Sequence, residues 1–159
     1  MMEWFYTYFP EIAECETRSA TVTEALPGLS VGEYSFVDLY CTDPGCSCTN
    51  VVLNVMERSR GHVATINHGL EEDSFKDVGT DRTFLDPLNK QTSSSPALLK
   101  LFREFLLTDA SYVERLRRHQ RMIKEKINAR APKNRRPPDP FQRLIHELKT
   151  ASNLRPPNR

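Results

Sequence analysis

The chain has 159 residues, 38% of them hydrophobic, which supports one compact domain of roughly 100 to 130 residues with a tail and excludes two full domains. No segment offers the roughly 18 apolar residues of a membrane span, and the start, MMEWFYTYFPEIAE, lacks a basic segment ahead of an apolar one, so a cytoplasmic protein is expected. The net charge of +1 hides an asymmetry: residues 1–109 carry 8 Lys/Arg against 17 Asp/Glu, a net −9, and residues 110–159 carry 14 against 4, a net +10.

The first half of the chain has the alternating, β-branched pattern of β-strands. Residues 17–26 are rich in Thr and Val and end at a Pro-Gly pair, and residues 33–41 alternate between two faces. Two more strands, at 51–57 and 62–68, flank a short polar turn that contains a glycine. The simplest topology is an antiparallel meander of three strands, with a fourth strand from the N-terminal run.

Helices are predicted in the second half of the chain. Residues 71–95 are acidic and rich in turn-forming residues, which indicates a loop. A helix begins at Pro96, and a second, amphipathic helix spans about 110–127. The predicted fold class is therefore α+β, in which a small antiparallel β-meander packs against a C-terminal helical hairpin within one domain, residues 1–127.

Residues 128–159 are predicted to be a flexible, basic tail. Six of the chain's eleven prolines lie between residues 132 and 157, a composition typical of a partly polyproline linker. One short helix is indicated at 140–151, with an apolar stripe that includes Phe141 and Leu144. A helix of this length needs another surface to pack on.

The cysteines supply the clearest functional pattern. Three of the four lie in YCTDPGCSCTN, residues 40–50, where Cys41, Cys46 and Cys48 have the spacing C-x4-C-x-C. If Cys41 closes one strand and Cys48 opens the next, the turn between them brings the sulfurs within the about 3.5 to 4 Å that tetrahedral zinc requires. Clustered cysteines in a reducing cytosol bind metal or do redox chemistry more often than they form structural disulfides. We therefore predict a zinc site.

Three cysteines leave a fourth zinc ligand to be found. Cys15, just before the first strand, would complete an all-thiolate site if that strand lies beside the turn. In a simple hairpin His68 pairs near residue 51, three positions past Cys48, whereas His62 pairs away from the thiols, so His68 is the preferred histidine. Water is the remaining candidate, and it would leave an open site of the catalytic type.

The sequence favours a binding or adaptor protein with a structural zinc over an enzyme. A zinc-dependent hydrolase or a thiol redox protein is the alternative, because water can hold the fourth place and Cys-Ser-Cys can form a strained disulfide. Cysteines without a special role are a further reading. The sequence contains no Gly-rich phosphate loop, Ser-His-Asp order or H-E-x-x-H pair.

Residues 115–136 form the densest basic region and are candidates to contact an acidic protein surface or nucleic acid, which makes a nucleic-acid-binding protein another alternative. A solvated amphipathic helix has the same pattern, and aromatic residues that would stack on single-stranded bases are absent from this stretch. His119 lies near the apolar side of the helix and is interpreted as a half-buried residue. The candidate contact residues are Arg115, Arg118, Arg121, Lys124, Arg135 and Arg136.

Several segments together resemble an uncharacterised group of bacterial hypothetical proteins with a Tyr-Cys-x-Asp-Pro-x-Cys-x-Cys turn. They are LYCTDPGCSCTNVVLNV, HVATINHG, FLDPLN and DASYVERLRRHQRMIKE, and the likeness covers roughly residues 8–127. Members usually read Cys-Asp-Cys-Arg-Arg where this chain has CSCTN at 46–50. The resemblance implies a metal-binding fold and no particular reaction.

Overall fold

The structure is a computed structural model that describes residues 1–76 and 79–130. One unit, Met1–Ala129, contains all the described helices and strands apart from the last residue of the final helix. The predicted tail from residue 128 and the short helix at 140–151 lie outside the described residues, except for 128–130.

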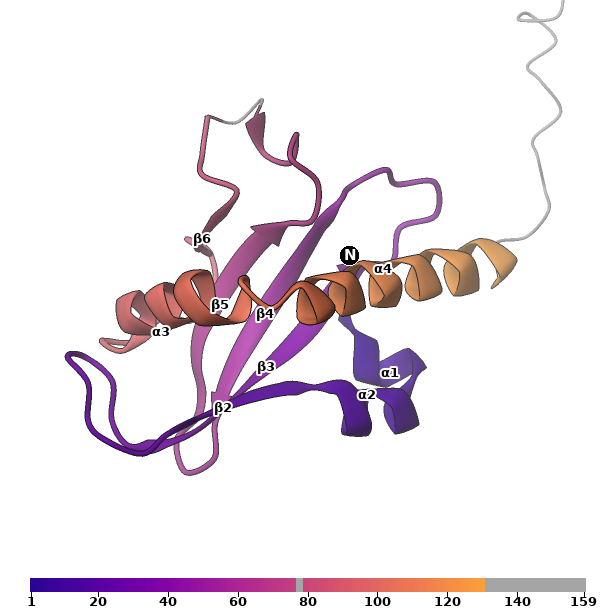
Figure 1. The fold of residues 1–159 in the computed structure, drawn as a ribbon. Helices are drawn as coiled ribbons and strands as arrows, with labels where there is room; N and C mark the ends of the chain where they lie inside the picture. Colours follow the sequence, from indigo (N-terminus) through magenta and orange to yellow (C-terminus); the bar gives the residue numbers. More distant parts are fainter. Residues whose placement is uncertain (77–78, 131–159) are drawn as a thin grey trace, which may run out of the picture. The chain divides into compact units, whose positions relative to one another are not determined.

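Six strands form one antiparallel sheet at the centre of this unit (Figure 1). In chain order they are β1 (Met2–Trp4), β2 (Arg18–Val22), β3 (Gly32–Cys41), β4 (Asn50–Glu57), β5 (Gly61–Gly69) and β6 (Thr83–Leu85). The three long strands β3, β4 and β5 follow one another as a meander, and β2 pairs with the first half of β3. The predicted meander and its fourth strand are therefore confirmed.

Two further strands were not predicted. β1 pairs with the second half of β3, so that β1 and β2 share one edge of that strand. β6 pairs with β5 at the opposite edge of the sheet, within the segment interpreted as a loop. Each has three residues, too few for alternation of apolar and polar side chains to be recognised in the sequence.

The helices are α1 (Phe5–Tyr8), α2 (Pro10–Glu16), α3 (Ser95–Leu101), the π-helix η2 (Phe102–Leu106) and α4 (Ala110–Arg130). In Figure 1, α3, η2 and α4 lie across one face of the sheet, which confirms the α+β class with a helical cover. The continuous segment of α3 and η2 does not form a hairpin with α4, however. The two follow one another across the sheet instead of lying side by side. Each has an apolar side that packs on the sheet, and this burial outweighs any contact between the two helices.

The core lies between the sheet and these helices. Alternation along β3 directs Tyr34, Phe36 and Tyr40 to the helical side, and all three are fully buried. Phe36 stacks on Phe102 of η2, with ring centroids 5.9 Å apart. Burial of a side chain of this size stabilises the fold by about 1.5–3 kcal/mol.

The short helices α1 and α2 connect β1 to β2 and pack beside α4. Phe5 of α1 is fully buried and stacks on the ring of His119 from α4, with centroids 3.8 Å apart. The N-terminal run therefore extends the core as well as the sheet. None of the helices in the described ranges is both long and apolar enough to cross a membrane.

Candidate metal centre

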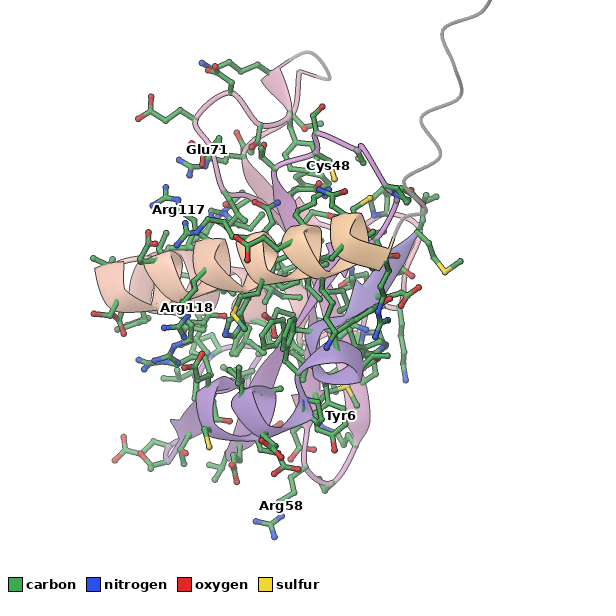
Figure 2. The ribbon with its side chains drawn as sticks, turned by 90° about the vertical axis from the view of Figure 1, so that its right-hand side faces the viewer. Tyr6, Cys48, Arg58, Glu71, Arg117 and Arg118 are labelled. Carbon is green, nitrogen blue, oxygen red and sulfur yellow. The ribbon has the colours of Figure 1, made fainter. Side chains whose placement is uncertain are left out.

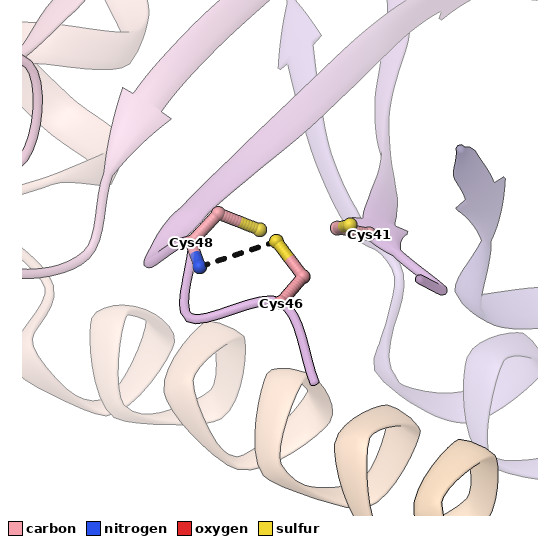
Figure 3. Close-up of side chains that lie close together, drawn as sticks. All are labelled: Cys41, Cys46 and Cys48. Carbon is pink, nitrogen blue, oxygen red and sulfur yellow. Dashed lines mark hydrogen bonds between the residues drawn. The ribbon is translucent and has the colours of Figure 1, made fainter. Parts of the chain in front are cut away.

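The three cysteines of the turn come together at the end of β3 (Figure 3). Cys41 is the last residue of β3, and Cys46 and Cys48 lie in the loop that leads to β4. Their three sulfur atoms lie within 4.8 Å of one another. A tetrahedral zinc with Zn–S bonds of about 2.3 Å places its sulfurs about 3.8 Å apart, so small side-chain rotations would close this group around an ion.

Local sequence explains why the loop turns back at this point. The amide of Cys46 donates to the carbonyl of Asp43 at 3.2 Å, which closes a β-turn with Pro44 and Gly45 at its centre. Gly45 has a φ of +75°, a value that favours glycine. Proline followed by a residue with positive φ is the pattern of a type II turn. The Asp-Pro-Gly sequence thus determines the approach of Cys46 to Cys41.

The two cysteines of the loop have thiols of different pKa, because their surroundings differ. The amide N–H of Cys48 donates to the sulfur of Cys46 at 3.4 Å, and this bond, helped by the neighbouring thiols, lowers the pKa of the Cys46 thiol to about 7. Burial raises the pKa of the Cys48 thiol to about 12, and its bonds to the other two thiols act in the same direction. All four cysteines of the chain are free thiols. Of the two loop cysteines, Cys46 therefore loses its proton to a metal more readily than Cys48.

Two side chains of α4 hold the loop from the other side. The ammonium of Lys124 donates to the carbonyl of Cys46 at 2.8 Å and lies 3.8 Å from the sulfur of Cys48. The amide of Gln120 donates to the carbonyl of Cys48 at 3.2 Å. Three thiolates around a divalent ion leave one net negative charge, which the Lys124 ammonium would offset.

Neither of the two predicted protein candidates for a fourth ligand joins the cluster. Among the described residues, Cys41, Cys46 and Cys48 are the only group of three or more His, Cys, Asp or Glu side chains with metal-binding proximity. Cys15 lies exposed on α2. His68 faces the core instead, where its Nδ1 atom lies 2.8 Å from the Thr83 hydroxyl.

The pairing of His68 was predicted correctly, but its direction was not. His68 pairs with Val51 across β4 and β5. Cross-strand partners share a face of the sheet, and Val51 belongs to the core beneath the helices. The His68 ring accordingly packs edge-on against Phe102, with centroids 5.7 Å apart. Strand pairing determines where a residue lies along the strand. The face of the sheet to which its side chain points determines what it contacts, and for His68 this is the core.

The basic side chains of α4 bond to other residues of the same unit. Arg115 donates to the carbonyl of Glu16 at 2.9 Å, and Arg118 pairs with the Glu16 carboxylate. Arg121 pairs with Glu114 at 2.8 Å. Lys124 bonds to the cysteine loop. Each described candidate contact residue therefore has a partner within the chain. The remaining two candidates, Arg135 and Arg136, lie outside the described residues.

Arg117 makes a comparable internal contact. Figure 2 shows Arg117 and Arg118 leaving opposite sides of α4, with Glu71 on the side of Arg117. The Arg117 guanidinium donates to the carbonyl of Leu70 at 3.0 Å and lies 3.9 Å from the Glu71 carboxylate. The basic helix α4 thus forms ion pairs with acidic residues of the first half of the chain. This agrees with the opposite net charges of the two parts of the sequence.

His119 is fully buried, whereas the sequence indicated a half-buried residue. Its side chain is 2% exposed, and its two ring nitrogens lie 2.7 Å from the carboxylates of Asp38 and Glu16. The helical pattern located His119 on the inner side of α4 but carried no signal for its two acidic partners, which lie on other elements.

Comparisons with models of protein families, with curated proteins and with solved structures found no match to this chain. The resemblance of residues 8–127 to a bacterial group stays a prediction.

Proposed function

We propose that this protein is a small zinc-binding module in which Cys41, Cys46 and Cys48 hold the ion, and that it acts in binding or as an adaptor. The observation that carries the proposal is the convergence of three sulfurs within 4.8 Å. Thiolates are soft ligands that favour zinc over the hard ions magnesium and calcium.

A zinc at this place would have a structural effect. It would join the end of β3 to the loop before β4, and Lys124 and Gln120 already tie that loop to α4. Because the unfolded chain has no preformed site, the free energy of metal binding would add to the free energy of folding. None of the loop residues 42–49 is buried, so the loop has little packing of its own.

A thiol redox protein or a zinc-dependent hydrolase would use the same three thiols. Oxidation would join Cys46 to Cys48, and hydrolysis would need a water activated by the ion together with a general base. We favour the binding module over the hydrolase because Asp43, a carboxylate 3.6 Å from the Cys41 sulfur, is 64% exposed, and the hydrogen bond from the Met1 amino group lowers the pKa of its carboxyl, which makes it a weak general base.

The test is elemental analysis of the full-length protein, purified without a histidine tag, beside a count of reactive thiols. We expect about one zinc per chain and protection of three thiols, with Cys15 still reactive. Cys46→Ser should lose the metal, and the matched variant Cys15→Ser should keep it. A metal-free chain with four freely reacting thiols would contradict the proposal.

Binding of an acidic protein surface or of nucleic acid through residues 115–136 is a separate proposal. Arg118 and Arg121 support it, because 48% and 57% of their side-chain surfaces stay exposed despite their ion pairs. A titration with DNA and RNA at low and moderate salt tests it, since phosphate binding weakens steeply as salt rises. No binding at low salt, or equal binding by Arg121→Gln, would remove α4 from this role.

A further inference from the structure

The surface is hollowed beside the cysteine cluster, between the loop before β4 and the C-terminal half of α4. The hollow has a volume of about 390 Å³. Its walls include Cys46 and Cys48 on one side and, from α4, Gln120, Arg121, Lys124 and Glu125 on the other. Cys46 and Cys48 are only partly buried and both line the hollow, so the cluster borders this open space.

We propose that the fourth place on the metal is open to an exogenous anionic ligand that binds in this hollow. The inference rests on the zinc site proposed above and names the class of ligand that this site binds. An ion held by three protein ligands, with an accessible fourth place, binds a further ligand from outside. Within residues 1–76 and 79–130, no fourth His, Cys, Asp or Glu side chain completes the group.

Two side-chain cations line the hollow and can bond an anion beside the metal, whose own charge the three thiolates more than neutralise. Lys124 lies against the cluster, with its ammonium 2.8 Å from the carbonyl of Cys46 and 3.8 Å from the sulfur of Cys48. An ammonium has three N–H donors, and these contacts use two of them. The third is available to an anion seated between the metal and α4, where a charge-assisted hydrogen bond would form. Arg121 adds a second cation, and Glu125 is the single carboxylate among the hollow's lining residues.

The experiment is an azide titration of the full-length protein loaded with Co²⁺, whose visible spectrum reports the number and kind of its ligands. Azide is a small anion that should enter the hollow and change the spectrum in a saturable way. Lys124→Gln should weaken azide binding by about fivefold or more, because the variant loses a charged donor. The matched control is Lys126→Gln, since Lys126 bonds the carbonyl of Tyr8 and does not line the hollow.

Four further variants show whether the chain itself supplies the fourth ligand. They are Cys15→Ser, Asp43→Asn, His68→Gln and His146→Ala, the last of which lies outside the described residues. We expect all four to keep the wild-type cobalt spectrum and azide affinity. A spectrum unchanged by azide, a changed spectrum in any of these variants, or equal azide affinity in Lys124→Gln and Lys126→Gln would overturn the inference. Failure of Cys41, Cys46 and Cys48 to bind Co²⁺ at all would instead overturn the proposed function.

Discussion

The Nδ1 atom of His119 lies 2.7 Å from a carboxylate oxygen of Asp38, and both side chains are almost fully buried, with 2% and 6% of their surfaces exposed. The Nε2 atom of the same ring lies 2.7 Å from the carboxylate of Glu16. Each nitrogen therefore lies within hydrogen-bond distance of a carboxylate, and the ring bridges Asp38 and Glu16. The Tyr40 hydroxyl donates to the same oxygen of Asp38 at 2.8 Å. The network joins α2, β3 and α4.

Removing one member of this network should destabilise the fold strongly. His119→Ala would leave the buried carboxyl of Asp38 without its partner from α4, and a buried polar group that loses a partner costs about 1–3 kcal/mol, and more when it is charged. Urea unfolding of wild type and variant measures the loss of free energy. The control is Asp81→Asn, because Asp81 pairs with Arg103 at the surface, with 82% of its side chain exposed, and such pairs contribute less than about 1 kcal/mol. Equal effects of the two substitutions would contradict the interpretation of His119 as a buried bridge between Asp38 and Glu16.

A second prediction concerns pH. Burial, reinforced by the positive charges of Arg82 and Arg117, lowers the pKa of His68 to about 4. In the unfolded chain the histidine pKa is about 6.5. Below that pH the unfolded chain binds a proton at His68, whereas the folded chain does not until about pH 4. His68 thus lowers stability as pH falls from about 6.5 to about 4.

Nuclear magnetic resonance of the histidine rings checks this directly. The ring signal of His68 in the folded protein should stay in its neutral form down to about pH 4. In unfolding experiments, His68→Gln should lose the part of the pH dependence between these two values. An unperturbed histidine has a pKa of about 6.5. A His68 signal that titrates near that pH would show that the ring is solvated.

The third prediction tests the structural effect of the metal. Chelation of zinc, or Cys46→Ser, should lower the melting temperature by roughly 10 °C, because the fold loses the free energy of metal binding. Cys15→Ser should melt like wild type and respond to chelator in the same way, since Cys15 lies exposed on α2. Melting of wild type and Cys46→Ser at one temperature, both indifferent to chelator, would count against a structural metal.

The fourth prediction compares two phenylalanines of η2. Phe102 is fully buried against Phe36, His68 and Tyr112, so Phe102→Ala should cost about 3–5 kcal/mol of unfolding free energy. Phe105, three residues along, is 64% exposed, and Phe105→Ala should change stability by about 0.5 kcal/mol or less. Denaturant unfolding measures both. Similar losses would mean that η2 does not pack with this face toward the sheet.

Local sequence anticipated the features that depend on neighbouring residues. The alternation in residues 33–41 and 51–68 predicted the meander, and Val51 pairs with His68 as expected. The Asp-Pro-Gly turn predicted the approach of the three cysteines, because the φ values it requires are carried by the turn residues themselves. Three-residue strands and short N-terminal helices gave too little periodicity to be found.

The sequence by itself determined the α+β class, the meander and the gathering of Cys41, Cys46 and Cys48, since strand alternation and turn geometry are properties of adjacent residues. Only the tertiary structure decided that the helices follow one another across the sheet, that His68 faces the core and that Lys124 joins the cysteine loop. It also placed His119 between Asp38 and Glu16, which lie 81 and 103 positions away in the sequence. Contacts over such separations follow from how complete faces pack together, which no local pattern records.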